Sequence, residues 1–500
     1  MRQGISTRVV AAICLLLVAS MFGACNQAGT EKAPSATATA AGAKLPITTS
    51  SDEAKKQYLE GRDKTERLLI ADSLANFDKA IELDPNFALA ELARANASQS
   101  PKEFFDHLAK AVALADKASE GEKLLIVSTK AGVDGDTAKQ KESLDKLVAM
   151  FPDDERVQVI VGGYYFGQQD YTKALEHYNK AIQTNANHAP AYNIAGYAYR
   201  QNGQMDKAEQ SFKKYIELIP KDPNPYDSYA ELLMKMGRFD ESIEQYRKAL
   251  AIDPKFIASR QGVAMNLLYG GKPAEATTEL EAITTNARND GDRRTALFAQ
   301  TVVDVDGGSM DRALADVDKQ IAIDEKSNDV QAVAGDLQLK AAILLEMGKA
   351  DEAGPQFAKA LETIEKSSQS QDFKDNAKLQ NRYNTASVAL AKKDVASAKS
   401  DADALLKGAT ATGNKALVRQ AHELAGMIAL EEKNYDAAIA ELNQASQQDP
   451  YNLYRLALAY QGKGDDAKAK EYAKKAADFN GLPQITYAMI RLKAKKMTGS

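Results

Sequence analysis

The sequence predicts an all-α protein, an α-solenoid in which tandem helical hairpins stack and a last helix caps the C-terminal end. Two observations support this prediction: helix-forming residues dominate the composition, and one short pattern recurs at a nearly constant spacing. The 500 residues include only 30 glycines and 14 prolines, so helix-breaking positions are few. We therefore do not expect a β-sandwich or a β-barrel.

The balance of basic and acidic residues limits the classes of partner that the chain is expected to bind. The chain has 64 basic and 69 acidic residues, which gives a net charge of −5. Such a balance leaves no basic excess to neutralise phosphates, so we expect no nucleic-acid partner. Charged residues make up 27% and hydrophobic residues 44% of the chain, as in folded proteins and unlike disordered ones.

Residues 1–24 have the organisation of an export signal. Arg2 and Arg8 supply positive charge near the N-terminus, and an uncharged, mainly apolar run follows over residues 9–22. As a helix this run would be about 21 Å long, which is too short for a bilayer core of about 30 Å. We therefore expect a cleaved signal peptide and no retained membrane span.

Cys25 follows this signal directly. The string Phe22-Gly23-Ala24-Cys25 resembles the lipobox of bacterial lipoproteins, in which cleavage precedes a cysteine that becomes diacylated. The only other cysteine, Cys14, would leave with the signal, so Cys25 has no disulfide partner in the mature chain. The resemblance implies lipid attachment at Cys25, and the alternative is a bystander cysteine.

The same resemblance implies a location. It places the protein in the bacterial cell envelope, lipid-anchored and facing the periplasm. Asn26 resembles the sorting pattern of the outer membrane more than that of the inner membrane. Residues 25–50 are rich in Ala and Thr and have no apolar periodicity. We expect them to form a flexible tether about 25–30 Å long.

A twelve-residue pattern recurs from residue 171 onward. Residues 171–182 align with 205–216, with 239–250 and, less cleanly, with 273–284. The marker position returns every 34 residues at first, at positions 174, 208, 242 and 276, and later at intervals of 31 to 45 residues. Periods in this range predict stacked helical hairpins.

Each period is expected to hold two helices and a tight turn. We expect a glycine at this turn to adopt the left-handed conformation that closes a helix. The turn glycines are Gly203, Gly237, Gly271, Gly308, Gly348 and Gly464. Prolines are expected to end the second helix of a unit. These prolines are Pro220, Pro254 and Pro450.

The residue types at fixed positions resemble the tetratricopeptide repeat family. In the unit 189–222 they are Tyr192, Gly196, Tyr199, Gly203, Ala208, Phe212 and Pro220. Small residues let paired helices approach closely, and aromatic residues fill the space beside them. The units 155–188 and 223–256 carry the same types of residue. The resemblance implies a right-handed α-solenoid with a long concave surface.

The quality of the repeats divides the chain into segments. After the signal and tether, we expect divergent units at 51–153, regular units at 154–288, longer divergent units at 289–413, and further units with the cap at 414–500. The hairpins together are expected to form one long structure. A terminal helix is expected over residues 482–496, where four cations would keep the exposed end soluble. These cations are Arg491, Lys493, Lys495 and Lys496.

No motif for catalysis or for a cofactor is present. The four histidines lie in different repeats and lack metal-ligand spacing. The acidic run at 304–308 lacks the ligand series of a calcium loop and falls where an inter-helix turn is expected. We therefore expect no enzyme, no cofactor and no metal.

In this family the first helix of each unit generally lines the concave surface. By position within the repeat, the partner-binding candidates are Asn193, Tyr197, Arg200, Asp227, Glu231, Met234, Gln261, Met265 and Tyr269. Tyrosine and methionine suit adaptable recognition of a helix or an extended peptide. The alternative is that Met265 and the tyrosines only pack between helices.

Some members of the family hold a C-terminal carboxylate with cations from successive first helices. The corresponding positions include Val159, Gly163, Asp227 and Glu231. Two acids stand where cations would be needed, so we do not expect this activity.

The expected function is a non-enzymatic scaffold that binds an envelope protein or peptide through its concave surface. The first alternative is a glycan-capturing outer-membrane lipoprotein with a helical core, but the chain has no Trp and no long insertion. The second is an enzyme whose site lies unrecognised in residues 284–413. Fold resemblance leaves the partner open.

Overall fold

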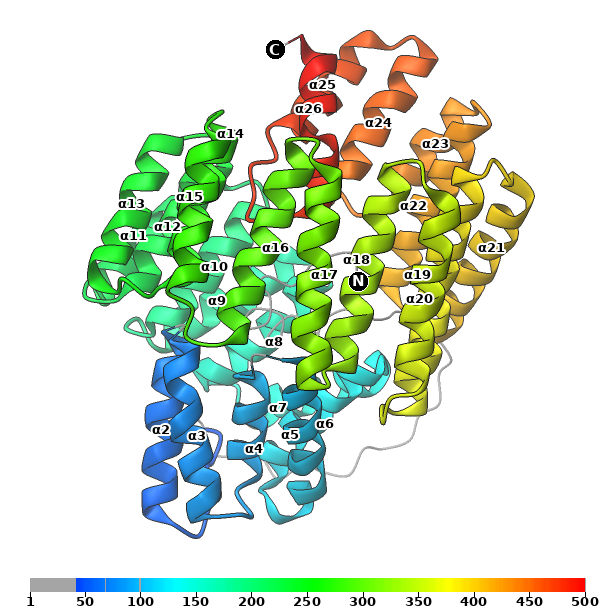
Figure 1. Cartoon of the computed structure of the whole chain (residues 1–500). Coiled ribbons are helices and arrows are strands. Elements are labelled where there is room, and N and C mark those ends of the chain that lie inside the picture. The colour runs from blue at the N-terminus through cyan, green and yellow to red at the C-terminus, as the bar shows by residue number, and fades with distance from the viewer. Residues whose placement is uncertain (1–41, 68, 99, 500) are drawn as a thin grey trace. The chain divides into compact units, whose positions relative to one another are not determined.

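The computed structural model describes residues 42–67, 69–98 and 100–499, and the regular structure within these ranges is helical (Figure 1). The predicted all-α solenoid of hairpins is confirmed. The expected signal peptide and Cys25 lie outside the described residues. Within the described ranges, no helix has both the length and the apolar character needed to cross a membrane.

The helices gather into two compact units whose boundary falls at Tyr229 and Ala230, inside one helix. This differs from the single long structure that we expected. We call the two parts the N-terminal unit, up to Tyr229, and the C-terminal unit, from Ala230.

The N-terminal unit consists of consecutive helices that pack against their neighbours along the chain. They are α2 (Asp52–Glu66), α3 (Ile70–Leu83), α4 (Ala88–Asn96), α5 (Pro101–Leu114), the 3-10 turn η2 (Ala115–Lys117), α6 (Glu120–Asp134), α7 (Thr137–Met150), α8 (Glu155–Gly167), α9 (Tyr171–Thr184), α10 (Ala189–Gln201), α11 (Met205–Leu218) and the first half of α12 (Pro223–Lys235).

The C-terminal unit continues the pattern from the second half of α12. Its further helices are α13 (Phe239–Ile252), α14 (Ile257–Tyr269), α15 (Pro273–Thr285), α16 (Asp290–Asp306), α17 (Met310–Ser327), α18 (Val330–Glu346), α19 (Ala350–Glu365), α20 (Gln371–Ala391), α21 (Val395–Thr412), α22 (Lys415–Glu431), α23 (Tyr435–Leu442), α24 (Pro450–Lys463), α25 (Asp466–Ala477) and α26 (Ile485–Thr498).

The predicted packing of small residues against aromatic rings is present in the regular units. A Cβ atom at Gly196 would lie 2.7 Å from the Phe212 ring, and one at Gly162 would lie 2.3 Å from the Tyr178 ring. Phe212 and Tyr178 are both buried. Because no side chain fits in this space, glycine sets the distance between the two helices of these hairpins.

Most of the turn glycines and helix-ending prolines have the conformation or position that the sequence predicts. Gly203 and Gly237 have φ of 74° and 75°, the left-handed conformation predicted for them. Pro220 lies just beyond α11, which ends at Leu218. Pro450 differs, because it is the first residue of α24. Proline is accommodated at this position because its missing N–H would have no partner within the helix.

Helix length separates the regular units from the divergent ones. Helices α8 to α15 have 13 or 14 residues, whereas α16 to α21 have 16 to 21. The extra residues of the longer repeats therefore lie in longer helices, and the turns between the helices stay short.

Candidate partner-binding surfaces

The nine predicted partner-binding residues lie on the first helices α10, α12 and α14. They fall in both units, with the first four in the N-terminal unit and the last five in the C-terminal unit. Seven of them are buried: Asn193, Asp227, Glu231, Met234, Gln261, Met265 and Tyr269. Tyr197 and Arg200 are half-buried.

Tyr197 and Arg200 form a small aromatic and cationic group on α10. The Tyr197 ring stands edge-on to Phe212, with 5.1 Å between ring centroids. The Arg200 guanidinium carbon lies 4.8 Å from the centroid of the Tyr197 ring. This group combines an anchored ring with a cation, as partner-binding surfaces often do.

The candidates on α14 are packed within the protein. Met265 has no exposed surface, and the Gln261 amide donates to the Thr295 carbonyl oxygen at 3.1 Å. The alternative in which Met265 packs between helices therefore describes its place in this structure.

An extended segment, residues 43–50, crosses the N-terminal ends of first helices in the N-terminal unit. The Leu45 N–H donates to Asp154 Oδ2 at 2.8 Å, and the Thr48 N–H donates to Glu122 Oε1 at 2.7 Å. The Ser50 N–H donates to Asp84 Oδ2 at 2.8 Å. We call Asp84, Glu122 and Asp154 the carboxylate ladder. The expected tether through residue 50 is therefore wrong for residues 43–50, because these carboxylates hold the backbone in place.

Each carboxylate of the ladder uses one oxygen for its own turn and the other for the segment. Asp154 Oδ1 accepts from the N–H groups of Arg156 and Val157 at the start of α8. Glu122 Oε2 accepts from the N–H of Ser119 at the start of α6. The capping carboxylates at the start of α6 and α8, and Asp84 in the turn that follows α3, therefore also bind an extended backbone.

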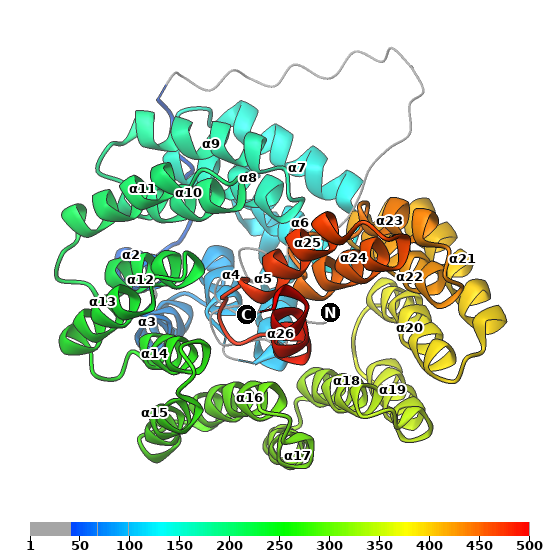
Figure 2. The same cartoon turned by 90° about the horizontal axis from the view of Figure 1, so that it is seen from above.

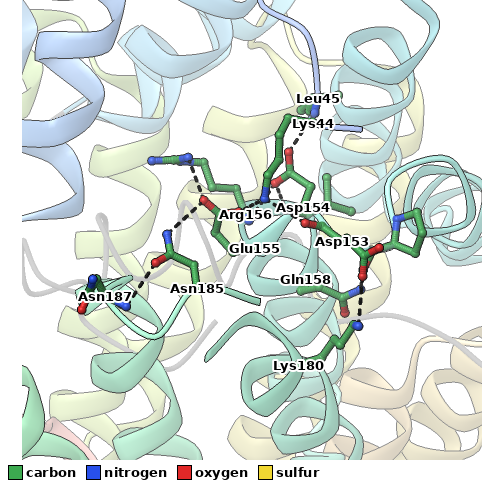
Figure 3. A network of polar contacts seen from close by, with 12 residues as sticks. Lys44, Leu45, Asp153, Asp154, Glu155, Arg156, Gln158, Lys180, Asn185 and Asn187 are labelled. Carbon is green, nitrogen blue, oxygen red and sulfur yellow. Dashed lines mark hydrogen bonds and ion pairs between the residues drawn. The ribbon is translucent and has the colours of Figure 1, made fainter. Parts of the chain in front are cut away.

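Lys44 adds a charged contact at the end of the ladder (Figure 3). Its ammonium donates to the Asp153 carbonyl oxygen at 2.8 Å and pairs with the Glu155 carboxylate. Partial burial opposes ionisation of Glu155, but the hydrogen bond from Lys44 and the backbone N–H of Glu155 outweigh it. Together they lower the pKa of Glu155 to about 2.

In the C-terminal unit, α26 occupies the inner face of the first helices. It packs on α16 as well as on its neighbours α24 and α25. Figure 2 shows α26 on the side of α16 that faces away from α15 and α17. Ile485, Tyr487 and Ile490 of α26 belong to the same buried apolar cluster as Met265 and Val302. This helix therefore fills part of the surface on which a partner was expected.

A buried ion pair fixes α26 on α16. Arg491 Nε and Nη2 donate to the two oxygens of Asp306 at 2.6 and 2.5 Å, and both residues are buried. The expectation that Arg491 keeps an exposed end soluble is wrong, because its charge is neutralised inside the protein. Lys496 is exposed, as expected.

The last residues of three first helices contact the C-terminal segment. Tyr269 ends α14 and donates to the Gly481 carbonyl oxygen at 2.7 Å. Asp306 ends α16, and Glu346 ends α18, where it pairs with Lys493. The carbonyl end of a helix is partially negative, so this row of helix ends favours the cations of α26.

His107, His177 and His422 are each paired with a residue of their own hairpin. His177 Nδ1 lies 2.8 Å from Gln158 Oε1, and His422 Nδ1 lies 2.7 Å from Glu441 Oε2. Among the residues that the structure describes, no three His, Cys, Asp or Glu side chains are placed to hold a metal ion.

Sequence reasoning missed both crossing segments. The signal for the first was a carboxylate at or near the start of successive first helices, at 84, 122 and 154. The signal for the second was Arg491 within the apolar pattern of Ile490 and Ala494. Helix capping and surface charge explain both signals equally well, so the contacts become evident only in the folded structure.

Comparison with known proteins identifies the repeats. Family models described as tetratricopeptide repeat match residues 141–190, 162–223, 223–256, 383–452 and 451–481. A small glutamine-rich tetratricopeptide repeat-containing protein 2 of Mycosarcoma maydis is 31% identical over 103 residues, which are 21% of this chain and 29% of that protein. Hsp70-Hsp90 organizing protein 3 of Arabidopsis thaliana is 30% identical over 117 residues, 23% of this chain and 20% of that protein. The chain thus spans less than a third of the length of these relatives.

Parts of the chain also match solved structures. A tetratricopeptide repeat protein from Parabacteroides merdae is 17% identical, with a TM-score of 0.36, over 52% of this chain and 97% of that one. YrrB, described as a TPR protein with an unusual peptide-binding site, is 19% identical, with a TM-score of 0.25, over 36% of this chain and 91% of that one. From the family models, we conclude that this chain contains tetratricopeptide repeats over residues 141–256 and 383–481.

Proposed function

We propose that the protein is a non-enzymatic interaction scaffold of the bacterial cell envelope, which binds a partner protein or peptide on the inner face of its repeats. The observation that carries the proposal is that the repeats hold peptide segments in two ways. The carboxylate ladder holds an extended backbone, and α16, together with Tyr269 at the end of α14, holds a helix. Both are recurring modes of peptide recognition.

The position of Tyr197 and Arg200 supports a surface for a partner on α10. Both side chains are half-buried; Tyr197 stands edge-on to the buried Phe212 ring, and Arg200 lies over the Tyr197 ring. A partner would therefore meet an anchored aromatic group and lose little side-chain entropy on binding it. The named relatives include proteins called Hsp70-Hsp90 organizing, which supports a protein or peptide as the ligand.

Site-specific crosslinking tests this proposal. A photoreactive amino acid at Tyr197 or Arg200 is expected to capture one protein of defined mass in intact cells. The same group at Lys213, exposed on the second helix α11, is the matched control. Equal capture from both helices would contradict a specific inner face.

Membrane attachment is part of the proposal. Lipid at Cys25 would hold the repeats at the membrane, the outer rather than the inner one, on its periplasmic side. Cells grown with labelled fatty acid are expected to label the wild-type chain and not the Cys25→Ser variant. A labelled Cys25→Ser variant, or an unlabelled wild type, would contradict this part of the proposal.

A further inference from the structure

The C-terminal segment is joined to the repeats through a short non-helical linker. Residues 478–484 connect α25 to α26, and Asn480 in this linker has a φ of 42°. The Lys235 ammonium donates to the Phe479 carbonyl oxygen and lies 3.4 Å from the Phe479 ring centroid. The linker and α26 thus follow the ends of α12, α14, α16 and α18 in order.

The contacts of α26 are made by side chains at a regular spacing. The Tyr487 ring packs edge-on against Tyr269, with 5.3 Å between centroids. Arg491, four residues later, forms the two hydrogen bonds to Asp306. Lys493, two residues after that, pairs with Glu346. Residues four apart lie on one helix face, so an aromatic ring and a guanidinium enter the groove together.

The groove residues that contact the C-terminal segment lie far from α26 in the sequence. Tyr269, Asp306 and Glu346 are each the last residue of a first helix, and each of these helices also packs against the second helix of its own hairpin. Removal of Arg491 would leave the buried Asp306 carboxylate without its bidentate cation, which is costly in a desolvated site. An empty groove would therefore select a helix that brings an arginine to Asp306.

We propose that the inner face of α14, α16 and α18 is a helix-binding groove, which α26 fills in the resting chain and vacates for a partner helix of matching chemistry. The partner helix carries an aromatic residue, an arginine four residues later, and a lysine two residues after the arginine. This inference rests on the proposed scaffold function and specifies the ligand class for one of its surfaces. The C-terminal segment then acts as an internal competitor.

Hydrogen exchange on the intact chain tests whether α26 opens by itself. The amides of α26 are expected to exchange at least tenfold faster than those of α16 and α24, through local opening of the segment. The Arg491→Ala variant is expected to increase this difference further. If the wild-type α26 exchanges only as fast as α16, the helix is a permanent part of the core and the proposal is overturned.

Binding in trans tests the chemistry of the groove. The probe is a fluorescent synthetic peptide of residues 478–499, added to the intact wild-type chain and to its Arg491→Ala variant. We expect at least tenfold tighter binding to the variant, and at least tenfold weaker binding when the peptide itself carries Arg491→Ala. Equal binding of the two peptides, or no binding to a variant whose α26 exchanges rapidly, would overturn the proposal.

A second route covers the case in which Arg491→Ala does not fold. A protease recognition sequence inserted between Gly481 and Leu482 allows α26 to be cut from the folded wild-type groove. Release of the fragment, followed by rebinding of the probe peptide, is the expected result. If the cut fragment does not leave, the proposal that α26 can be exchanged for a partner helix is overturned. The scaffold proposal itself would fail separately, if crosslinking from α10 found no specific partner while the peptide bound the groove.

Discussion

The two units each hold a segment of their own chain, and they do so in opposite ways. The N-terminal unit holds residues 43–50 through backbone N–H groups at the N-terminal ends of its helices. The C-terminal unit holds α26 through side chains at the C-terminal ends of α14, α16 and α18. The first contact combines hydrogen bonds from a backbone that any sequence has with side-chain contacts of Lys44, Thr49 and Ser50. The second is made mainly by particular side chains in register.

This difference follows from the two ends of a helix. The N-terminal end leaves N–H groups without a helical partner, and a capping carboxylate there has a second oxygen to offer. The C-terminal end leaves carbonyl groups and a partial negative charge, which attract cations. A repeat protein therefore offers two rows of sites, one suited to extended backbones and one suited to cationic helices.

The largest expected effect is at Arg491. Its replacement by Ala leaves the buried Asp306 without a cation, so we expect the C-terminal unit to lose about 3–5 kcal/mol of unfolding free energy. Urea unfolding followed by circular dichroism measures this loss, and hydrogen exchange assigns it to the unit.

Two further variants sharpen this result. Lys496→Ala, on the same helix and exposed, should change the unfolding free energy by less than about 0.5 kcal/mol. Replacing both Arg491 and Asp306 by apolar residues of similar volume should recover most of the loss. A loss at Lys496 as large as that at Arg491 would mean that general charge, and not the buried pair, holds α26.

How well each unit was predicted from the sequence depends on how local its contacts are. Gly196 and Phe212 lie in one hairpin, so the repeat pattern predicted their contact. Arg491 and Asp306 are 185 residues apart, and no periodicity connects them. Asp154 was predictable as a helix cap, but its second hydrogen bond, to Leu45, depends on where a distant segment lies.

The next largest effect is a loss of stability of the N-terminal unit at acidic pH. Glu155 has a pKa of about 2 in the folded chain, below its ordinary value of 4.5, so its ionised form stabilises the fold above about pH 4.5. This contribution, about 2 kcal/mol, is lost as the pH falls from 4.5 through 2. Unfolding of the N-terminal unit measured between pH 6 and pH 2.5 should show this slope. The slope should shrink in Glu155→Gln, and an unchanged slope in that variant would assign the acid sensitivity to other groups.

A smaller effect is expected at the carboxylate ladder. Asp84→Ala removes acceptors for the N–H groups of Ser50 and Asn86 and for the Thr49 hydroxyl, which should cost about 1–2 kcal/mol. Hydrogen exchange should show the amide of Ser50 losing its protection first. Pro46→Ala, at an exposed position of the same segment, is the control. If Pro46→Ala released the segment equally, side chains and not the backbone would hold it.

The smallest effect compares two matched ion pairs, Lys44 with Glu155 and Lys493 with Glu346. The lysine side chains are 52% and 48% exposed, and the carboxylates 8% and 11%. Glu155 stands at the start of α8, where the helix end stabilises a negative charge without Lys44, whereas Glu346 stands at the end of α18, where the helix end opposes it. Each Lys→Met variant should cost about 1 kcal/mol or less, and the loss should be smaller for Lys44, because the backbone N–H of Glu155 still lowers the pKa of that carboxyl when Lys44 is removed. Equal losses in urea unfolding would mean that the helix ends do not distinguish the two segments, and the comparison between the units would then rest on the buried Arg491 pair alone.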